Sequence, residues 1–159
     1  MNKLIQLVTE DDIWTAAEGE NDGTPFILRY RPNLQDFLTT KKYNKRLVLI
    51  WLYDSDNSSL MPSNEEMELM EEVENSLVDI LEKDVQSVLA FVYTGQNQKE
   101  WHWYSSNIEE TGKRLNAALA GFDKLPIELS SEDDPDWGEY NSVLAGADDS
   151  QSEGNSDEN

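Results

Sequence analysis

The sequence predicts an α+β fold organised around one buried strand. Residues 46–53, RLVLIWLY, contain a single charge and many β-branched or aromatic side chains, which is typical of a strand covered on both faces. A helix, two strands, a second helix and a short strand are predicted after it, so residues 46–129 have the order βαββαβ. This order is the split βαβ of a ferredoxin-like, two-layer sandwich. We expect that sandwich with an added N-terminal β-hairpin and a short C-terminal helical segment.

The first predicted helix begins after Ser63 and ends near Lys83. Ser63 and Glu66 have the spacing of a capping box, in which each side chain accepts a hydrogen bond from the backbone N–H of the other residue. Apolar residues at steps of three and four are expected to face the core: Met67, Met70, Val73, Leu77, Ile80 and Leu81. Acidic residues mostly take the other, solvated side: Glu65, Glu68, Glu71, Glu72, Asp79 and Glu82.

Turn and cap residues predict the other elements. Residues 12–18 and 24–31 flank Asn-Asp-Gly, whose glycine can supply a positive φ, and are predicted as the N-terminal hairpin. Residues 32–44 are expected to be a loop with one helical turn. The later elements are a hairpin of 88–94 and 100–105, a helix from the Asn107 cap to Gly121, and a strand over 125–129.

The C-terminal part divides into an apolar segment and a polar tail. Trp137, Tyr140, Val143 and Leu144 have helical spacing, so this segment is expected to dock on the domain. After it the composition is Asp, Ser, Glu, Gly and Asn without an aromatic residue, which leaves too little apolar surface to offset ordering entropy. We expect residues 1–145 to form a single domain and residues 146–159 to be a disordered acidic tail.

Net charge limits the possible partners. The chain has 33 acidic and 12 basic residues, a formal net charge of −21, and such a charge repels the phosphates of nucleic acid. We expect no direct nucleic-acid binding and suspect a basic protein partner. Half of the basic residues fall within residues 29–46, and we interpret them as a solvated sheet edge in preference to a binding patch: Arg29, Arg31, Lys41, Lys42, Lys45 and Arg46.

Cysteine is absent, which excludes disulfides, thiolate metal sites and cysteine nucleophiles. Charge interrupts the N-terminal residues before a signal-peptide core could form, and no apolar stretch approaches the roughly 20 residues of a spanning helix. We therefore expect a cytoplasmic protein that does not bind a membrane. The oligomeric state is left open.

Catalytic patterns are few. The only histidine, His102, lies between Trp101 and Trp103, so a Ser-His-Asp triad or a multi-histidine metal site would have to include it. No GxSxG, P-loop or GxGxxG motif occurs. We interpret His102 as a structural or surface residue and expect no catalytic site, no cofactor and no metal.

A weak calcium-loop pattern follows the central strand. Four residues match positions one, three, five and twelve of that pattern: Asp54, Asp56, Ser58 and Glu65. Ser59 replaces the turn glycine, Pro62 occupies the ninth position, and a strand precedes the loop where a helix is required. We favour a polar loop that ends in a helix cap, and cation binding by Asp54, Asp56 and Glu65 is left open.

Aromatic residues gather on the first and third core strands, which lie side by side in the predicted sheet: Trp51, Tyr53, Trp101, Trp103 and Tyr104. If some of these side chains project from the face opposite the helices, they form an aromatic platform. RNA-binding domains of this fold use such a platform with basic residues around it, but the net charge of this chain is negative. We expect the N-terminal hairpin or the Trp137 segment to cover this face. The binding candidates are Trp51, Tyr53, Trp101, Trp103, Glu68, Glu71, Glu72, Asp79, Trp137 and Tyr140.

The order of these segments resembles a known family. A hairpin, the strand VLIWLYD, an acidic helix, the strands FVYTG and EWHWY, and DPDWGEY are similar to the bacterial family domain of unknown function 695, over residues 13–144. That family is similar to the regulator of ribonuclease activity B family, acidic ferredoxin-like proteins that bind and inhibit the endoribonuclease RNase E. Residues 137–140, WGEY, resemble the WGxY of that regulator. The regulator lacks the N-terminal hairpin and places its WGxY soon after the second helix, so no inhibitory residue is carried over.

These observations favour a non-catalytic protein-binding or regulatory module, and the resemblance implies that it modulates an RNA-processing enzyme. An acidic helix face and an acidic tail suit a basic, RNA-binding partner. Two alternatives are left open: a small enzyme with a carboxylate-based site, and an immunity-type protein that neutralises a basic toxin.

Overall fold

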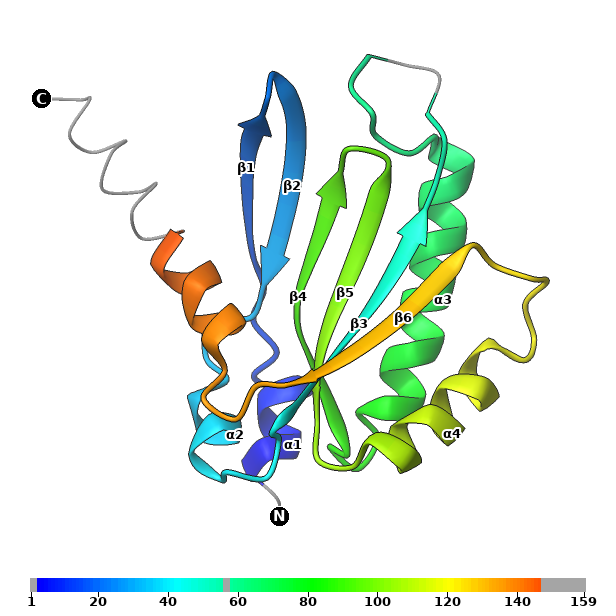
Figure 1. Ribbon diagram of the computed structural model, residues 1–159. Helices are drawn as coiled ribbons and strands as arrows, with labels where there is room; N and C mark the ends of the chain where they lie inside the picture. Colours follow the sequence, from blue (N-terminus) through cyan, green and yellow to red (C-terminus); the bar gives the residue numbers. More distant parts are fainter. Residues whose placement is uncertain (1–2, 56–57, 147–159) are drawn as a thin grey trace, which may run out of the picture.

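Six antiparallel strands form a sheet in the order β1-β2-β4-β5-β3-β6 (Figure 1). The structure is a computed structural model that describes residues 3–55 and 58–146. The strands are β1 (Thr15–Asn21), β2 (Thr24–Tyr30), β3 (Lys45–Leu52), β4 (Ser87–Gly95), β5 (Gln98–Ser105) and β6 (Ile127–Asp133). The fold is therefore a mixture of helices and an antiparallel sheet, as the sequence predicts.

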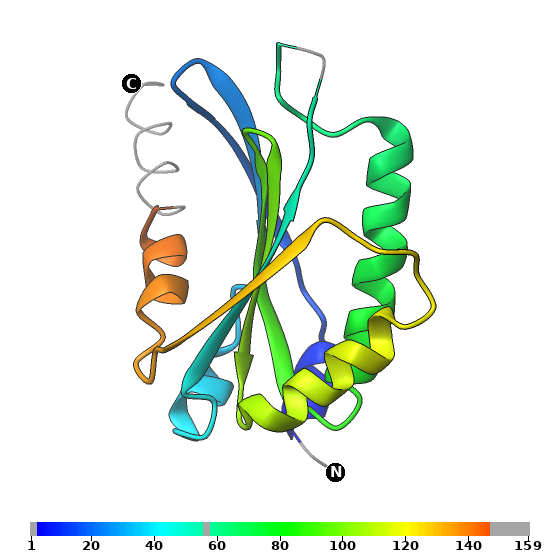
Figure 2. The ribbon, with the colours of Figure 1, turned by 45° about the vertical axis from the view of Figure 1, so that its right-hand side comes forward.

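Helices lie on both faces of the sheet (Figure 2). They are α1 (Lys3–Val8), α2 (Gln35–Thr39), α3 (Asn64–Leu81) and α4 (Ile108–Leu119), and a last helix covers residues 138–146 of the described chain. α3 and α4 cover the face toward which Leu49 and Trp101 point, which we call the helical face. α2 and the last helix cover part of the opposite face, toward which Tyr104 points, which we call the C-terminal face.

β3 lies between β5 and β6 and contributes to the core of the helical face. Leu47, Leu49 and Trp51 are at most 3% exposed and belong to one cluster with the apolar stripe of α3. These residues alternate along β3, so all three side chains point to the same face. The predicted neighbourhood of the first and third core strands, β3 and β5, is confirmed by their register from Lys45–Ser105 to Leu52–Gln98.

The predicted capping box of α3 is confirmed, and two residues of the helix lie on the other side from the one predicted. The Ser63 hydroxyl accepts from the Glu66 N–H, and the Glu66 carboxylate accepts from the Ser63 N–H, both at 3.1 Å. Met67, predicted in the core stripe, lies in the first turn of α3, is 42% exposed and does not belong to the core cluster. Glu82, predicted on the solvated side, is 5% exposed because it follows the helix end and turns toward a buried arginine.

The predicted N-terminal hairpin is confirmed but does not cover a face of the sheet. Asp22 and Gly23 both have positive φ, at 52° and 84°, as a tight two-residue hairpin turn requires. β2 then pairs with β4 from Phe26–Gly95 to Tyr30–Phe91. The hairpin therefore widens the sheet, because the free backbone groups of the β4 edge supply partners for β2.

The bounds of the last strand, β6, differ from the predicted residues 125–129. The last strand begins at Ile127, since the Ile127 N–H donates to the Leu125 carbonyl in a tight turn at 2.8 Å. It continues to Asp133 through polar residues because backbone pairing with β3 does not need an apolar pattern.

α2 is the predicted helical turn within residues 32–44, and α1 was not predicted because six residues are too few for a periodic signal.

Two arginines of the basic window are buried, so the interpretation of a solvated edge is wrong for them. Arg31 is 2% exposed, and its guanidinium donates to Glu82 at 2.6 and 3.1 Å and to Asp12 at 2.9 Å. Arg46 is 7% exposed and contacts side chains on the C-terminal face. Each arginine is buried because carboxylates from distant parts of the sequence neutralise it.

Residues 147–159, nearly all of the predicted acidic tail, lie outside the described residues. Residue 146 still belongs to the last helix. The prediction of a disordered segment over 146–159 and of one domain over 1–145 therefore stays a prediction. Within the described ranges, no helix combines the length and the apolar composition that crossing a bilayer requires.

Candidate functional site

Four of the aromatic binding candidates are core residues of the helical face. Trp51, Tyr53, Trp101 and Trp103 are 3%, 7%, 0% and 0% exposed and share one cluster with α3 and α4. Trp101 and Trp103 alternate along β5, and Tyr53, the residue after β3, continues the alternation of Trp51, so all four point to the same face. They do not form the aromatic platform considered from the sequence, and Tyr104 alone of the five lies on the C-terminal face.

Trp137 and Tyr140 fasten the C-terminal segment to the C-terminal face. Trp137 stacks on Tyr104 with 4.0 Å between ring centroids, and its indole N–H donates to the Tyr43 carbonyl at 2.8 Å. The Tyr140 hydroxyl donates to the Arg31 carbonyl at 2.5 Å. Both side chains are at most 1% exposed. The expectation that the Trp137 segment docks and covers this face is thus confirmed for the area around Tyr104.

A polar cluster occupies the part of the C-terminal face beside that segment. Arg46 donates through Nη1 to His102 Nδ1 at 3.2 Å and through Nη2 to Glu132 at 2.6 Å. His102 Nε2 lies 2.8 Å from Glu100 Oε1, and its ring stacks on Phe91 with centroids 4.1 Å apart. His102 is therefore a structural residue, which agrees with the interpretation from the sequence.

The tautomer of His102 follows from these partners. A guanidinium can only donate, so Nδ1 accepts from Arg46 and the Nε2–H donates to Glu100. The hydrogen bond from His102 lowers the pKa of Glu100 from its ordinary value of 4.5, against the opposing effect of burial. Both ring nitrogens are engaged, which leaves neither ready to take a proton from a bound substrate without rearrangement.

The acidic candidates lie together on the outer side of α3. Glu68, Glu71, Glu72 and Asp79 are all exposed, and none forms an ion pair with another residue of the described chain. The inner side of the same helix is buried through Met70, Val73, Leu77 and Leu81. α3 thus separates a core stripe from a charged surface, as its sequence predicts.

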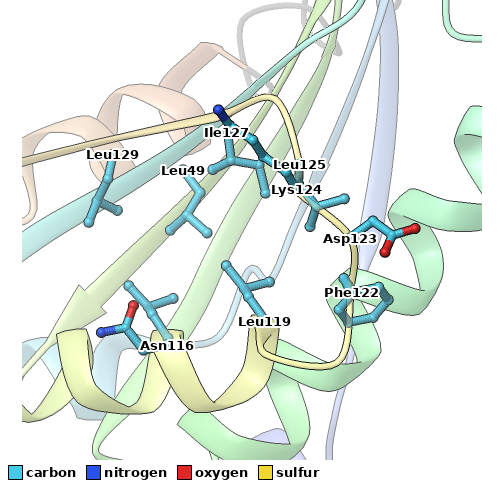
Figure 3. Close-up of a pocket in the computed structure, with 10 residues that line it drawn as sticks. Leu49, Asn116, Leu119, Phe122, Asp123, Lys124, Leu125, Ile127 and Leu129 are labelled. Atoms are coloured by element: carbon cyan, nitrogen blue, oxygen red, sulfur yellow. The ribbon is translucent and has the colours of Figure 1, made fainter.

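An apolar groove lies between α4 and β6 on the helical face (Figure 3). It encloses about 340 Å³, and its lining is mostly apolar: Leu49, Leu115, Leu119, Phe122, Leu125, Ile127 and Leu129, with Asn116, Asp123 and Lys124 among them. Leu129 is 55% exposed, although it points into this groove from β6 (Figure 3). The groove thus leaves apolar surface open beside a sheet edge.

Sequence reasoning missed this groove. The sequence predicts a helix to Gly121 and a strand over 125–129, but apolar spacing does not say how far the connecting loop stands from the sheet. Residues 120–126 form the loop between α4 and β6, and this loop passes around the end of α4 (Figure 3). The one available signal was the isolated Leu129 among charged and hydroxyl residues in the strand IELSSED.

The calcium-loop pattern has one member, Asp56, outside the described residues. Among the residues that the structure describes, no three histidine, aspartate or glutamate side chains are grouped so that they could hold a metal ion. Glu66 is engaged in the α3 cap, as the favoured interpretation of a polar loop ending in a cap requires.

Residues 12–145 match a family model whose description is family of unknown function (DUF695). The chain belongs to this family. The match covers the sheet from β1 to β6, helices α2 to α4 and nearly all of the last helix, and it leaves out α1. Searches of curated proteins and of solved structures find no match.

Proposed function

We propose that this DUF695 protein is a non-catalytic module that binds a basic protein. The observation that carries this proposal is the division of α3, where Glu68, Glu71, Glu72 and Asp79 are exposed while the opposite side of the helix builds the core. A charged surface on a rigid helix needs no rearrangement to meet a basic partner. With a net charge of −21 the whole molecule also attracts such a partner over a distance.

The partner that we propose is an RNA-processing enzyme, as for the regulator of ribonuclease activity B family. A ferredoxin-like core supports that relation, because β6-β3-β5-β4 have the strand order and antiparallel directions of a split βαβ with α3 and α4 on one face. The segment 137–140, WGEY, supports it as well, since Trp137 and Tyr140 are both docking residues. Enzymes that handle RNA present basic surfaces, which an acidic face can occupy.

Binding rather than catalysis is supported by the state of the buried ionisable groups. His102 has both ring nitrogens engaged, and Glu82 is paired with Arg31 and accepts the Leu89 N–H at 2.7 Å. A carboxylate so occupied holds the fold together and is not free for proton transfer. Turnover of a small substrate that is lost in the His102→Ala variant would contradict this part of the proposal.

The test compares two variants with the same change of charge. In one, Glu68, Glu71 and Glu72 become Gln and Asp79 becomes Asn. In the control, the exposed Glu10, Glu18 and Glu20 become Gln and Asp22 becomes Asn. Wild type and both variants are used to capture proteins from native lysate at 0.1 M and 1 M salt, where the Debye length falls from about 10 to about 3 Å.

We expect wild type and the control to retain a basic RNA-processing enzyme at low salt and the α3 variant to lose it. Circular dichroism should show unchanged thermal midpoints, because the substituted groups are exposed. Equal losses in both variants would mean that only bulk charge matters and would contradict the role of α3. Tight, salt-resistant binding of RNA by the purified protein would contradict the proposed function itself.

A further inference from the structure

β6 is the outer strand on one edge of the sheet, and half of its backbone groups face outward. The Leu52 N–H donates to the Pro126 carbonyl at 3.0 Å, and the Asp134 N–H donates to the Asn44 carbonyl at 2.9 Å. In an antiparallel pair, every second residue directs both backbone groups to the neighbouring strand. The even-numbered residues of β6 therefore bond to β3, while Leu129 and Ser131 point their N–H and C=O groups away from it.

Among the odd-numbered residues of β6, Ile127 and Leu129 carry side chains that line the α4–β6 groove. Leu129 pairs with Leu49, whose side chain lies in the core of the helical face, so both point toward α4 (Figure 3). An extended segment added beside β6 would place its residue opposite Leu129 on this face too, since directly paired side chains share a face. An apolar side chain there would cover the open half of Leu129 and fill the groove.

The other face of β6 has the opposite chemistry. Glu128 and Glu132 alternate with Leu129 and Ser131, point toward the C-terminal face, and are exposed, Glu132 by 64% of its side chain. Residues of an added strand opposite them would best be basic. A second copy of this chain does not meet that requirement, because it would bring another net charge of −21 to the same edge.

We propose that β6 and the α4–β6 groove form a docking site for an extended segment of a basic protein. The segment adds a strand antiparallel to β6, with apolar side chains over the groove and lysine or arginine side chains opposite Glu128 and Glu132. This inference rests on the proposed function, because it assigns a binding mode to the basic partner. It differs from that proposal in the surface, since β6 and the acidic side of α3 are separated by α4 (Figure 2).

The probe is a nine-residue peptide that alternates lysine and valine, with blocked ends. Two controls have the same length: one alternates glutamate and valine, and one carries its lysines and valines in two blocks. We expect only the alternating lysine peptide to shift the backbone amide signals of residues 127–133 in nuclear magnetic resonance spectra and to slow hydrogen exchange at Leu129 and Ser131. Shifts confined to α3, or equal binding of the block peptide, would overturn the inference.

The decisive variant is Ser131→Pro, with Ser131→Ala as its matched control. Proline removes the outward N–H of residue 131 without removing a hydrogen bond to β3, so the thermal midpoint should stay close to that of wild type. We expect Ser131→Pro to weaken peptide binding roughly tenfold, as the loss of one strand hydrogen bond and of close approach predicts, and Ser131→Ala to keep it. Unchanged binding by Ser131→Pro overturns the inference.

Further outcomes separate this inference from the proposed function. Failure of the alternating peptide to bind, with basic-protein capture still dependent on the α3 acids, overturns edge docking and leaves the proposed function intact. Failure of both overturns both. Sedimentation of wild type as a dimer that Ser131→Pro dissociates would identify a second copy as the occupant and overturn the assignment to a basic partner.

Discussion

The two faces of the sheet are held together in different ways. The helical face is an apolar layer in which the stripe of α3 packs on alternate residues of β3 and β5. The C-terminal face also has an apolar cluster, and it adds specific contacts between distant residues, such as the stacking of Trp137 on Tyr104 and the bonds of Arg46 to His102 and Glu132. The helical face follows repeating patterns, whereas the C-terminal face also depends on single partners that are distant in the sequence. On the C-terminal face, substitution of a buried partner such as Trp137 should therefore be costly.

The largest effect is expected from Trp137→Ala. This side chain is 1% exposed, and its removal leaves a cavity beside Tyr104 and an unpaired Tyr43 carbonyl, so the free energy of unfolding should fall by about 3 to 5 kcal/mol. Urea unfolding followed by far-ultraviolet circular dichroism measures it. Trp137→Phe is the control and should lose less. Unfolding of Trp137→Ala at the wild-type midpoint would show that the C-terminal face contributes little to stability.

Glu82→Ala tests a buried ion pair on the helical side of the molecule. Arg31 would lose its closest carboxylate, at 2.6 Å, while keeping Asp12 at 2.9 Å. We expect a loss of roughly 3 kcal/mol, the low end for a broken buried pair, because Asp12 still compensates part of the charge. Glu132→Gln is the comparison on the C-terminal face, and it should cost below about 1 kcal/mol since Glu132 is 64% exposed. Equal losses of stability in the two variants would show that the pair of Arg31 with Glu82 contributes no more than the pair of Arg46 with Glu132.

Acid should weaken the polar cluster of the C-terminal face through Glu100. The pKa of Glu100 lies below its ordinary value of 4.5 in the folded protein, chiefly because His102 donates to its carboxylate. The folded state therefore holds this carboxylate more strongly than the unfolded chain does. Its stabilising contribution is complete above pH 4.5 and is lost as the pH falls through the lowered pKa. Thermal midpoints of wild type should consequently fall more steeply below pH 4.5 than those of Glu100→Gln, and parallel curves would contradict this assignment.

The smallest effect is expected from removing residues 151–159, which lie outside the described residues. The segment is QSEGNSDEN, without apolar side chains, so it has nothing to bury against either face. The thermal midpoint should stay within about 2 °C of wild type in differential scanning calorimetry. A large fall would show that this segment packs on the molecule.

Local patterns predicted the parts of the structure that depend on neighbouring residues. The capping box of α3, the turn at Asp22 and Gly23 and the alternation of β3 each involve residues within one turn or one strand. The misassigned residues depend on where the helix ends lie in the fold. Glu82 continues the acidic spacing of α3, and only its position beside Arg31 distinguishes it from its exposed neighbours. Met67 continues the apolar spacing, but it lies in the first turn and is 42% exposed.

The sequence by itself determined the α+β class, the acidic outer side of α3 and the docking role of Trp137, because these follow from periodicity, charge and one apolar cluster in a polar segment. Only the tertiary structure decided which way the tryptophans of β5 point, that Arg31 and Arg46 are buried, and that a groove remains open beside Leu129. Those outcomes depend on strand order and register. They bring together residues tens of positions apart, and no short-range pattern in the chain encodes which of them meet.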